Sequence, residues 1–154
     1  DVDIILAPNS NTIANLEKLS EEFIVPICSS EIAENINSIA DLEQVTPIHI
    51  LGFDDHWTRY MAEFGLQHEV KLTRLMVDTS VAACELVANN LGRAIVIERF
   101  AISAMSTGQN INITGDRIPL KQSHYLVKKD VTKERKSTVL IFNEWLRAQF
   151  LKQG

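Results

Sequence analysis

Residues 76–100, MVDTSVAACELVANNLGRAIVIERF, hold the pattern that decides the fold of this chain. An apolar, strand-like run leads into the polar triplet Asp78-Thr79-Ser80, which is followed by small and apolar residues and then by a second apolar run. These runs predict a helix over 80–91 and a strand over 94–97. A strand, a helix and a strand in this order are typical of an α/β fold.

The same alternation continues through most of the chain. Apolar runs predict further strands over 2–7, 22–28, 48–53, 70–77 and 122–128. Caps and apolar periodicity predict short helical turns after Ser29 and Ser38, and helices over 56–64, 100–106 and 137–152. The pattern favours a mainly parallel sheet, with 2–7 as a buried, parallel-type strand. Pro26 lacks a backbone donor, so its strand is expected at an edge or at a crossing between sheets.

The composition is that of a globular protein. The chain has 154 residues, of which 45% are apolar and 23% charged, enough for one domain or two small lobes. Its net charge of -5 does not favour direct DNA binding, because phosphate contacts need clustered positive charge. No apolar run approaches the roughly 18 residues of a membrane span, and no signal peptide is visible. Two distant cysteines without CxxC spacing indicate a reduced, cytoplasmic protein.

The sequence carries no recognisable catalytic or metal-binding motif. It has no GxSxG elbow, no HExxH pair and no glycine loop that would cradle a phosphate, so we expect neither an enzyme nor a cofactor. Asp54, Asp55 and His56 could form a metal cluster. However, two acids in front of a helix are better explained as caps and as partners of the helix dipole, so no metal is expected. Cys84 is expected to be a small buried residue.

The triplet Asp78-Thr79-Ser80 is the best candidate for ligand contact. In parallel α/β sheets, ligands collect beyond the carboxyl ends of the strands, where helix N-termini present unpaired N–H donors. The hydroxyls of Thr79 and Ser80 could donate to a polar ligand group. Both residues could also cap the helix, and the two roles are compatible.

The order of motifs resembles the effector-binding domain of bacterial LysR-type transcriptional regulators, in particular the branch with the glycine-cleavage activator and the β-lactamase regulator. The matching stretches are DVDIILAPN, FIVPICSSEIAE, IADLEQVTPIHILG, HWTRYMAEFGL, ACELVANNLGRAIV, and SHYLVKK with STVLIFNEWLRAQF. The first is similar to the family's opening strand, the second to a crossing segment, and the last pair to its closing strand and helix.

The resemblance implies a two-lobed fold like that of type 2 periplasmic binding proteins. One lobe would run from 28 to 117 and be complete. The other would combine 1–27 with 118–154 and lack its early part, and the chain would cross between the lobes near Pro26 and Pro119. The family's N-terminal winged helix-turn-helix lies outside this sequence, so DNA would be contacted only through that domain. We therefore expect the chain to start partway through a larger protein.

The resemblance also implies a small-molecule effector bound between the lobes. An effector that binds two lobe arrangements with different affinity would change the geometry of a dimer or tetramer and so the spacing of its DNA-binding domains. No membrane partner is expected. The candidate effector-binding residues are Asp78, Thr79, Ser80, Pro8, Asn9, Cys28 and Tyr125.

Two alternatives stay open at this point. A solute-binding protein of a transport system would share the fold. A regulator could also respond to redox state or pH through Cys28 or His124 rather than to a bound metabolite.

Overall fold

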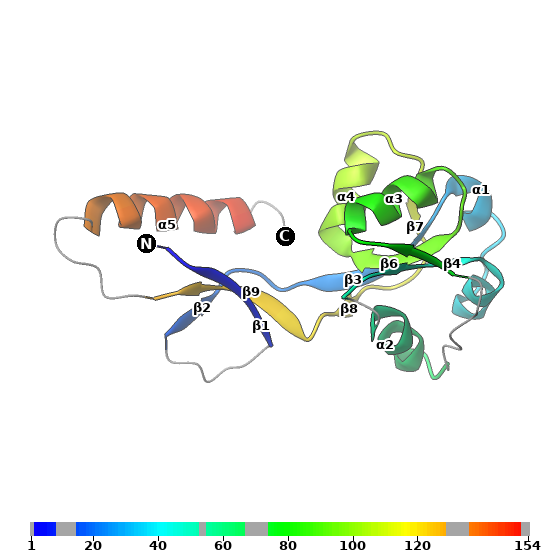
Figure 1. The fold of residues 1–154 in the computed structure, drawn as a ribbon, viewed down its shortest axis with the longest axis horizontal. Coiled ribbons are helices and arrows are strands. Elements are labelled where there is room, and N and C mark those ends of the chain that lie inside the picture. The colour runs from blue at the N-terminus through cyan, green and yellow to red at the C-terminus, as the bar shows by residue number, and fades with distance from the viewer. Residues whose placement is uncertain (1, 9–14, 53–54, 67–73, 129–135, 152–154) are drawn as a thin grey trace. The chain divides into compact units, whose positions relative to one another are not determined.

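The computed structural model describes residues 2–8, 15–52, 55–66, 74–128 and 136–151 (Figure 1). The chain separates into two compact units. Unit 1 combines Asp1–Glu22 with Pro119–Gly154, and unit 2 is Phe23–Ile118. The sequence placed the limits of one lobe at residues 28 and 117, and the role of each unit as a regulatory lobe stays a prediction.

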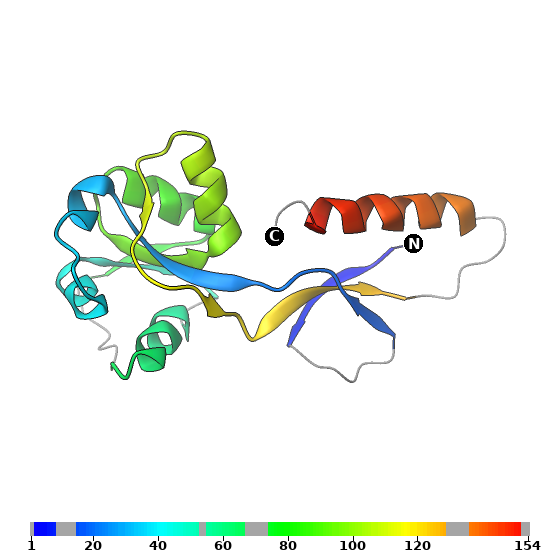
Figure 2. The same cartoon turned by 180° about the vertical axis from the view of Figure 1, so that it is seen from behind.

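Unit 1 contains a small antiparallel sheet and one long helix, α5 (Lys136–Leu151) (Figure 2). Its strands, in the order β1-β9-β2, are β1 (Ile4–Pro8), β9 (Gln122–Val127) and β2 (Leu16–Lys18). Arg147 of α5 donates from Nη2 to Oε2 of Glu17 on β2 at 2.8 Å, and Leu146 of α5 is buried. This ion pair and this buried side chain attach α5 to its own sheet.

The strand predicted over 2–7 is present as β1, but it is neither parallel nor buried. It pairs antiparallel with β9 at one edge of the sheet, in a register that places Ile5 opposite Tyr125. Ile4, Ile5 and Leu6 are 39% to 46% exposed. An apolar run predicts a strand, but it does not reveal whether neighbouring elements cover the two faces of that strand.

Unit 2 holds the remaining elements. Its strands are β3 (Phe23–Cys28), β4 (Pro47–Ile50), β5 (Leu75–Val77), β6 (Arg93–Ile97), β7 (Asn112–Ile113) and β8 (Ile118–Pro119). Its helices are α1 (Ser30–Ala33), the 3₁₀ helix η1 (Ile39–Gln44), α2 (Asp55–Glu63), α3 (Ser80–Ala88) and α4 (Glu98–Ser106). The sequence pattern predicted the main helices and strands of this unit. It predicted that α4 begins at Phe100, two residues after its observed start. Residues 70–73 of the predicted strand 70–77 lie outside the described part of the chain.

The sheet of unit 2 is mixed, which corrects the prediction of a mainly parallel sheet. Its strand order is β5-β4-β6-β3-β7, and β8 also pairs with β3. β4 runs parallel to both β5 and β6, whereas β3 runs antiparallel to β6 and to β7. The segment with α1 and η1 that joins β3 to β4 does not cross the sheet, because the last residues of β3 and the first residues of β4 both lie beside the start of β6. β3 therefore runs opposite to β4 and β6.

Pro26 lies inside this sheet, between β6 and β7, and not at an edge. It is opposite Ile95 of β6, and its carbonyl accepts a hydrogen bond from the Thr114 backbone N–H at 3.0 Å on the other side. In an extended strand the nitrogen and carbonyl of one residue point the same way, so the missing Pro26 donor faces away from β6. The ladder between β3 and β6 therefore loses no hydrogen bond.

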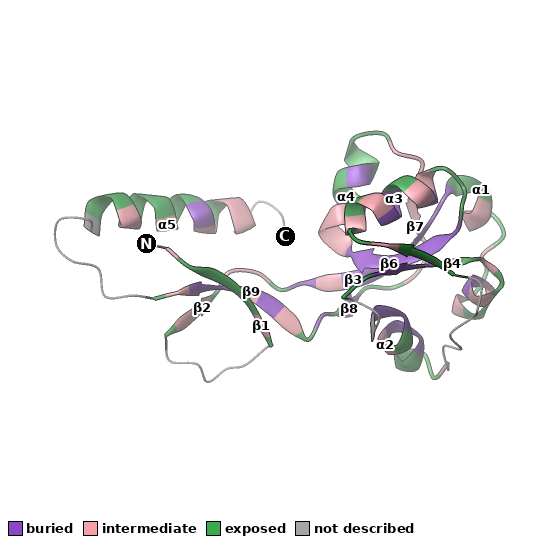
Figure 3. Cartoon of the chain, viewed as in Figure 1, coloured by how far each residue is buried: buried purple, intermediate pink, exposed green. Residues whose placement is uncertain are grey.

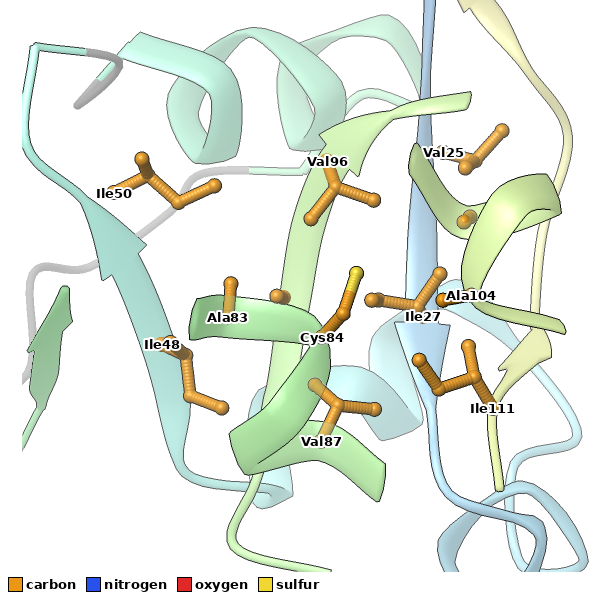
Figure 4. Close-up of a cluster of buried hydrophobic side chains, with 12 residues drawn as sticks. Val25, Ile27, Ile48, Ile50, Ala83, Cys84, Val87, Val96, Ala104 and Ile111 are labelled. Carbon is orange, nitrogen blue, oxygen red and sulfur yellow. The ribbon is translucent and has the colours of Figure 1, made fainter. Parts of the chain in front are cut away.

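Helices cover both faces of the unit 2 sheet (Figure 1). One face packs against α3 and α4 through a cluster that includes Val25, Ile48, Cys84, Val96 and Ala104 (Figure 4). The buried residues concentrate on β3, β4 and β6, while the outer surfaces of the helices are exposed (Figure 3). Cys84 is 2% exposed, which confirms the prediction of a small buried side chain.

On the other face, α2 packs Trp57 and Tyr60 against the sheet, and Trp57 contacts the buried guanidinium of Arg93. The guanidinium of Arg93 lies 4.0 Å from the ring centroid of Trp57, and its Nε donates to the Val45 carbonyl at 2.9 Å. Arg93 is 1% exposed, and burial lowers its pKa to about 10. The Trp57 indole donates in turn to the Ile48 carbonyl at 3.1 Å. These contacts fix α2 against the start of β6.

Helix α3 ends at Ala88, three residues before the predicted end. Asn90 has a φ of 63°. Its left-handed backbone turns the chain so that the Leu91 N–H donates to the Leu86 carbonyl at 3.1 Å, which closes the helix end. An asparagine in the last predicted turn was sufficient to end the helix early.

Candidate functional site

The carboxyl ends of three parallel strands meet at one edge of the unit 2 sheet. Because β4 is parallel to β5 and β6, the strand ends at Ile50, Val77 and Ile97 lie along the same edge. The Leu51 N–H donates to the Val77 carbonyl at 2.8 Å and so connects the end of β4 with the end of β5. Helices α3 and α4 begin at this edge, and it is where ligands bind in open α/β sheets.

The start of α3 confirms the predicted position of the Asp78-Thr79-Ser80 triplet at a helix N-terminus. Thr79 is the N-cap, and its hydroxyl accepts a hydrogen bond from the Ala82 N–H at 3.1 Å. Asp78 and Thr79 are exposed, and Ser80 is half-buried. The Thr79 oxygen is thus already engaged as a cap, whereas the Ser80 hydroxyl makes no hydrogen bond to any of the described residues. Ser80 is therefore the freer donor of the two.

The start of α4 adds charged groups that the sequence reasoning missed. Glu98 follows β6 directly, and its carboxylate lies 3.3 Å from the guanidinium of Arg117. Arg117 also lies over the ring of Phe23, 4.3 Å from its centroid. An acid directly after an apolar strand, where the dipole of a helix favours it, was the available signal for Glu98. Nothing in the sequence pattern pointed to Arg117.

Cys28 lies at the opposite edge of the unit 2 sheet from the triplet. It ends β3, which is antiparallel to β6, so its neighbours are the first residues of β6 and Asn112 of β7. The side chain is fully buried, with Sγ 3.8 Å from the Thr114 hydroxyl. Burial raises the pKa of the thiol. The structure therefore does not bring Cys28 together with Asp78, Thr79 or Ser80.

Two of the other candidate residues belong to unit 1. Pro8 is exposed at the end of β1, opposite Gln122, and Tyr125 is buried in β9 opposite Ile5. Asn9 lies outside the described residues. His124 of β9 pairs with Glu22, with 3.0 Å between Nδ1 and Oε1, and Glu22 also accepts a hydrogen bond from Ser20.

Neither a metal cluster nor a membrane span is found in the described part of the chain. No group of three or more His, Cys, Asp or Glu side chains there could hold a metal ion. Of the weighed cluster, Asp54 is not described, Asp55 begins α2 and His56 is buried. Among the same residues, no helix has the length and apolar character needed to cross a membrane.

Comparison with known proteins gives fold similarity without sequence similarity. No protein-family model matches the chain, and no curated protein does. The solved structures that it resembles include effector-binding domains of LysR-type transcriptional regulators.

One of these structures is the effector domain of the regulator AmpR from Pseudomonas aeruginosa, with a TM-score of 0.75 and 22% identity. The match covers 99% of this chain and 73% of that one. The AmpR effector-binding domain of Citrobacter freundii gives a TM-score of 0.74 at 20% identity, over 99% of this chain and 75% of the other. Full-length LysG of Corynebacterium glutamicum, solved with its effector Arg, gives 0.65 at 13% identity, over 97% and 51%.

These matches confirm the predicted fold. The chain has the α/β fold of LysR effector-binding domains, which is the type 2 periplasmic-binding-protein-like fold. The agreement extends along nearly all of the chain, so it includes the elements of both units.

Proposed function

We propose that this chain is the effector-sensing domain of a LysR-type DNA-binding transcriptional regulator. The observation that carries the proposal is the match of nearly the whole chain to effector-binding domains of such regulators. The solved relatives include a domain in complex with 2-PG and a full-length protein with bound Arg, so this fold accommodates small effectors in those proteins. Fold alone does not fix function, and the site must supply the rest.

The carboxyl edge of unit 2 is the part of the proposed effector site that the structure describes best. The N-terminus of α3 offers backbone N–H donors, and Ser80 adds a hydroxyl that is free of the capping role. Glu98 and Arg117 place one charge of each sign at the same edge. This arrangement suits a small polar effector that carries both donors and acceptors. Pro8 and Tyr125 of unit 1 and the buried Cys28 stay predicted contacts.

The wider role follows from the same proposal. The domain would act as a non-enzymatic sensor in a cytoplasmic dimer or tetramer, and DNA would be contacted through a separate winged helix-turn-helix. Effector binding would favour one arrangement of the oligomer over another, by as much as its affinities for the two states differ.

The experiment is a DNA footprint of the protein from its complete reading frame, on the DNA upstream of its own gene. The footprint is measured with and without a filtered small-molecule extract of the source cells, for the wild type and for Ser80→Ala. Ser80→Ala removes the hydroxyl but keeps the Thr79 cap, so the fold is expected to persist. Ser137→Ala, an exposed position near the start of α5, is the matched control.

We expect the extract to change the footprint of the wild type and of Ser137→Ala, and to change that of Ser80→Ala at least about tenfold less at equal extract concentration, as for loss of a ligand hydrogen bond. A footprint that no extract changes in any of the three proteins would contradict the effector-sensing role. An equal response in all three would remove Ser80 from the site. No observation favours the solute-binding alternative over the regulator.

A further inference from the structure

The backbone that leads to Arg117 is fixed on the sheet of unit 2. The Thr114 N–H donates to the Pro26 carbonyl at 3.0 Å. Two residues further on, the Asp116 carbonyl accepts a hydrogen bond from the Tyr60 hydroxyl of α2 at 2.7 Å. Arg117 follows directly, so its side chain starts from a position that contacts with two other elements hold in place.

The guanidinium of Arg117 is oriented, but most of its hydrogen-bonding capacity is unused. It lies 4.3 Å from the ring centroid of Phe23, a contact that uses none of its N–H donors. A guanidinium has five such donors. In the described part of the chain its one hydrogen-bond acceptor is Glu98, which Nη1 contacts at 3.3 Å. The Arg117 side chain is 58% exposed, so solvent reaches it.

The pair between Arg117 and Glu98 is a weak one. Charged N–H···O bonds are typically about 2.7 to 2.9 Å long, and arginine often binds a carboxylate through two of them. Here a single bond of 3.3 Å joins the two groups. Glu98 also has a second source of stabilisation, because it is the first residue of α4, where the helix dipole favours a negative charge. Glu98 can therefore release Arg117 at little cost.

The free donors of Arg117 match a carboxylate from solution. The planar fork of a guanidinium binds a carboxylate through two parallel hydrogen bonds. An incoming carboxylate would thus replace one long bond with two. Phosphate groups also bind arginine, but a phosphate dianion beside the Glu98 carboxylate would be repelled more strongly than a monoanion. The pair therefore favours a carboxylate.

We propose that Glu98 is an internal competitor for Arg117. Without effector, the Glu98 carboxylate pairs with the guanidinium, and a carboxylate group of the effector takes its place through two hydrogen bonds. This inference rests on the proposed effector-sensing function and concerns the same edge of unit 2. It adds the residue that anchors the effector, the charged group by which the effector is recognised, and the opposing role of Glu98.

The test compares Arg117→Gln with Glu98→Gln in the protein from its complete reading frame. The DNA footprint is titrated with the small-molecule extract of the source cells. Either substitution breaks the pair, so a purely structural pair predicts the same change for both variants. Arg74→Gln is the control, because Arg74 is exposed and precedes β5, at the opposite edge of the sheet. The footprint without extract shows whether each variant is folded and binds DNA.

We expect opposite effects from the two substitutions. Arg117→Gln should need at least about tenfold more extract than the wild type for the same change in the footprint, because the anchoring hydrogen bonds are lost. Glu98→Gln should need about two- to fivefold less, because the competing charge of an exposed pair is removed. Arg74→Gln should respond as the wild type does. A change in the same direction for Arg117→Gln and Glu98→Gln, or an unchanged response of Arg117→Gln, would overturn the proposal.

The charged group of the effector is tested on the extract itself, with the wild-type protein. One portion is treated with a carbodiimide and methylamine, which converts carboxylates into neutral amides, and a second with alkaline phosphatase. A third receives methylamine alone. We expect the first to lose its effect at least about tenfold and the other two to keep it. An effect that survives amidation, or that phosphatase removes, would overturn the carboxylate assignment and leave the effector-sensing function intact. An untreated extract without effect on any protein would contradict that function itself.

Discussion

At the scale of single residues, Gly92 shows how closely the chain passes itself at the start of β6. A Cβ at this position would lie 2.4 Å from the backbone oxygen of Thr46. The next residue, Arg93, donates its N–H to that same oxygen at 2.9 Å. The pairing of β6 with β4 therefore depends on a residue without a side chain at position 92.

We predict that Gly92→Ala lowers the free energy of unfolding by about 1 to 3 kcal/mol more than Gly65→Ala does. The new Cβ would clash with the backbone oxygen of Thr46, which cannot rotate away as a side chain could. Gly65 also has a positive φ, of 72°, but a Cβ added there would have no atom within 4 Å. Urea unfolding followed by circular dichroism measures both. Equal losses for the two variants would show that the contact with Thr46 is unimportant.

The burial of Cys28 has a consequence for the redox alternative. The side chain is fully buried, and burial raises the pKa of its thiol; burial likewise raises the pKa of Cys84 to about 11. The thiolate is the reactive form, so both residues should resist thiol reagents.

In the folded protein at neutral pH we expect labelling of both thiols on the order of 100-fold slower than in guanidinium, where they are exposed. Labelling by a thiol-specific chromogenic reagent, with peptide mapping to separate the two sites, checks this. Fast labelling of Cys28 in the folded chain would restore the redox alternative.

At the scale of elements, the ion pair between Glu17 and Arg147 connects β2 with α5. The Arg147 hydrogen bond and charge hold the pKa of Glu17 below its ordinary value of 4.5. A carboxyl whose pKa is lower in the folded state stabilises the fold above its unfolded pKa. That contribution is lost as the pH falls through the folded pKa.

We predict that Glu17→Gln lowers the melting temperature near neutral pH. The corresponding loss in the free energy of unfolding should be under about 1 kcal/mol, because the ion pair is partly exposed. The difference from wild type should begin to shrink below pH 4.5 and should disappear as the pH falls through the lowered pKa of the folded Glu17, where the wild-type carboxylate is protonated as well. Melting curves over this range measure it. Glu21→Gln, which breaks the more exposed pair with Lys18, is the control and should have a smaller effect. A difference that does not depend on pH would contradict the assignment.

The elements also show what sequence patterns can predict. The caps at Ser29, Ser38 and Thr79 and the stop at Gly65 were readable, because local hydrogen bonding and backbone preference decide helix ends. The direction of β3 and the exposure of β1 were not readable. Both depend on which distant strand pairs with them and on what covers them.

The same limit applies to the candidate site. The triplet at residues 78–80 was predicted because a strand followed by a capped helix is a local pattern. The placement of Cys28 at the opposite edge follows from antiparallel pairing with β6, and the Glu98–Arg117 pair joins residues far apart in the chain. Neither of these was accessible from local sequence.

At the scale of the whole molecule, the fold is shared with LysR effector-binding domains, whereas the sequence is 22% identical or less to the AmpR and LysG structures. The fold is therefore shown, and the regulator role is the proposal that needs a direct test. It requires that the protein in its native cell carries a DNA-binding segment in addition to these 154 residues.

The most direct measurement of that claim is the intact mass of the protein isolated from its own cells, together with the sequence of its complete reading frame. If the chain belongs to a regulator, we expect a mass greater than that of these 154 residues and a winged helix-turn-helix upstream in the same frame. A mass equal to that of these residues, from a frame without a DNA-binding segment, would contradict the regulator role. A secretion signal in front of the domain would instead support a transport protein.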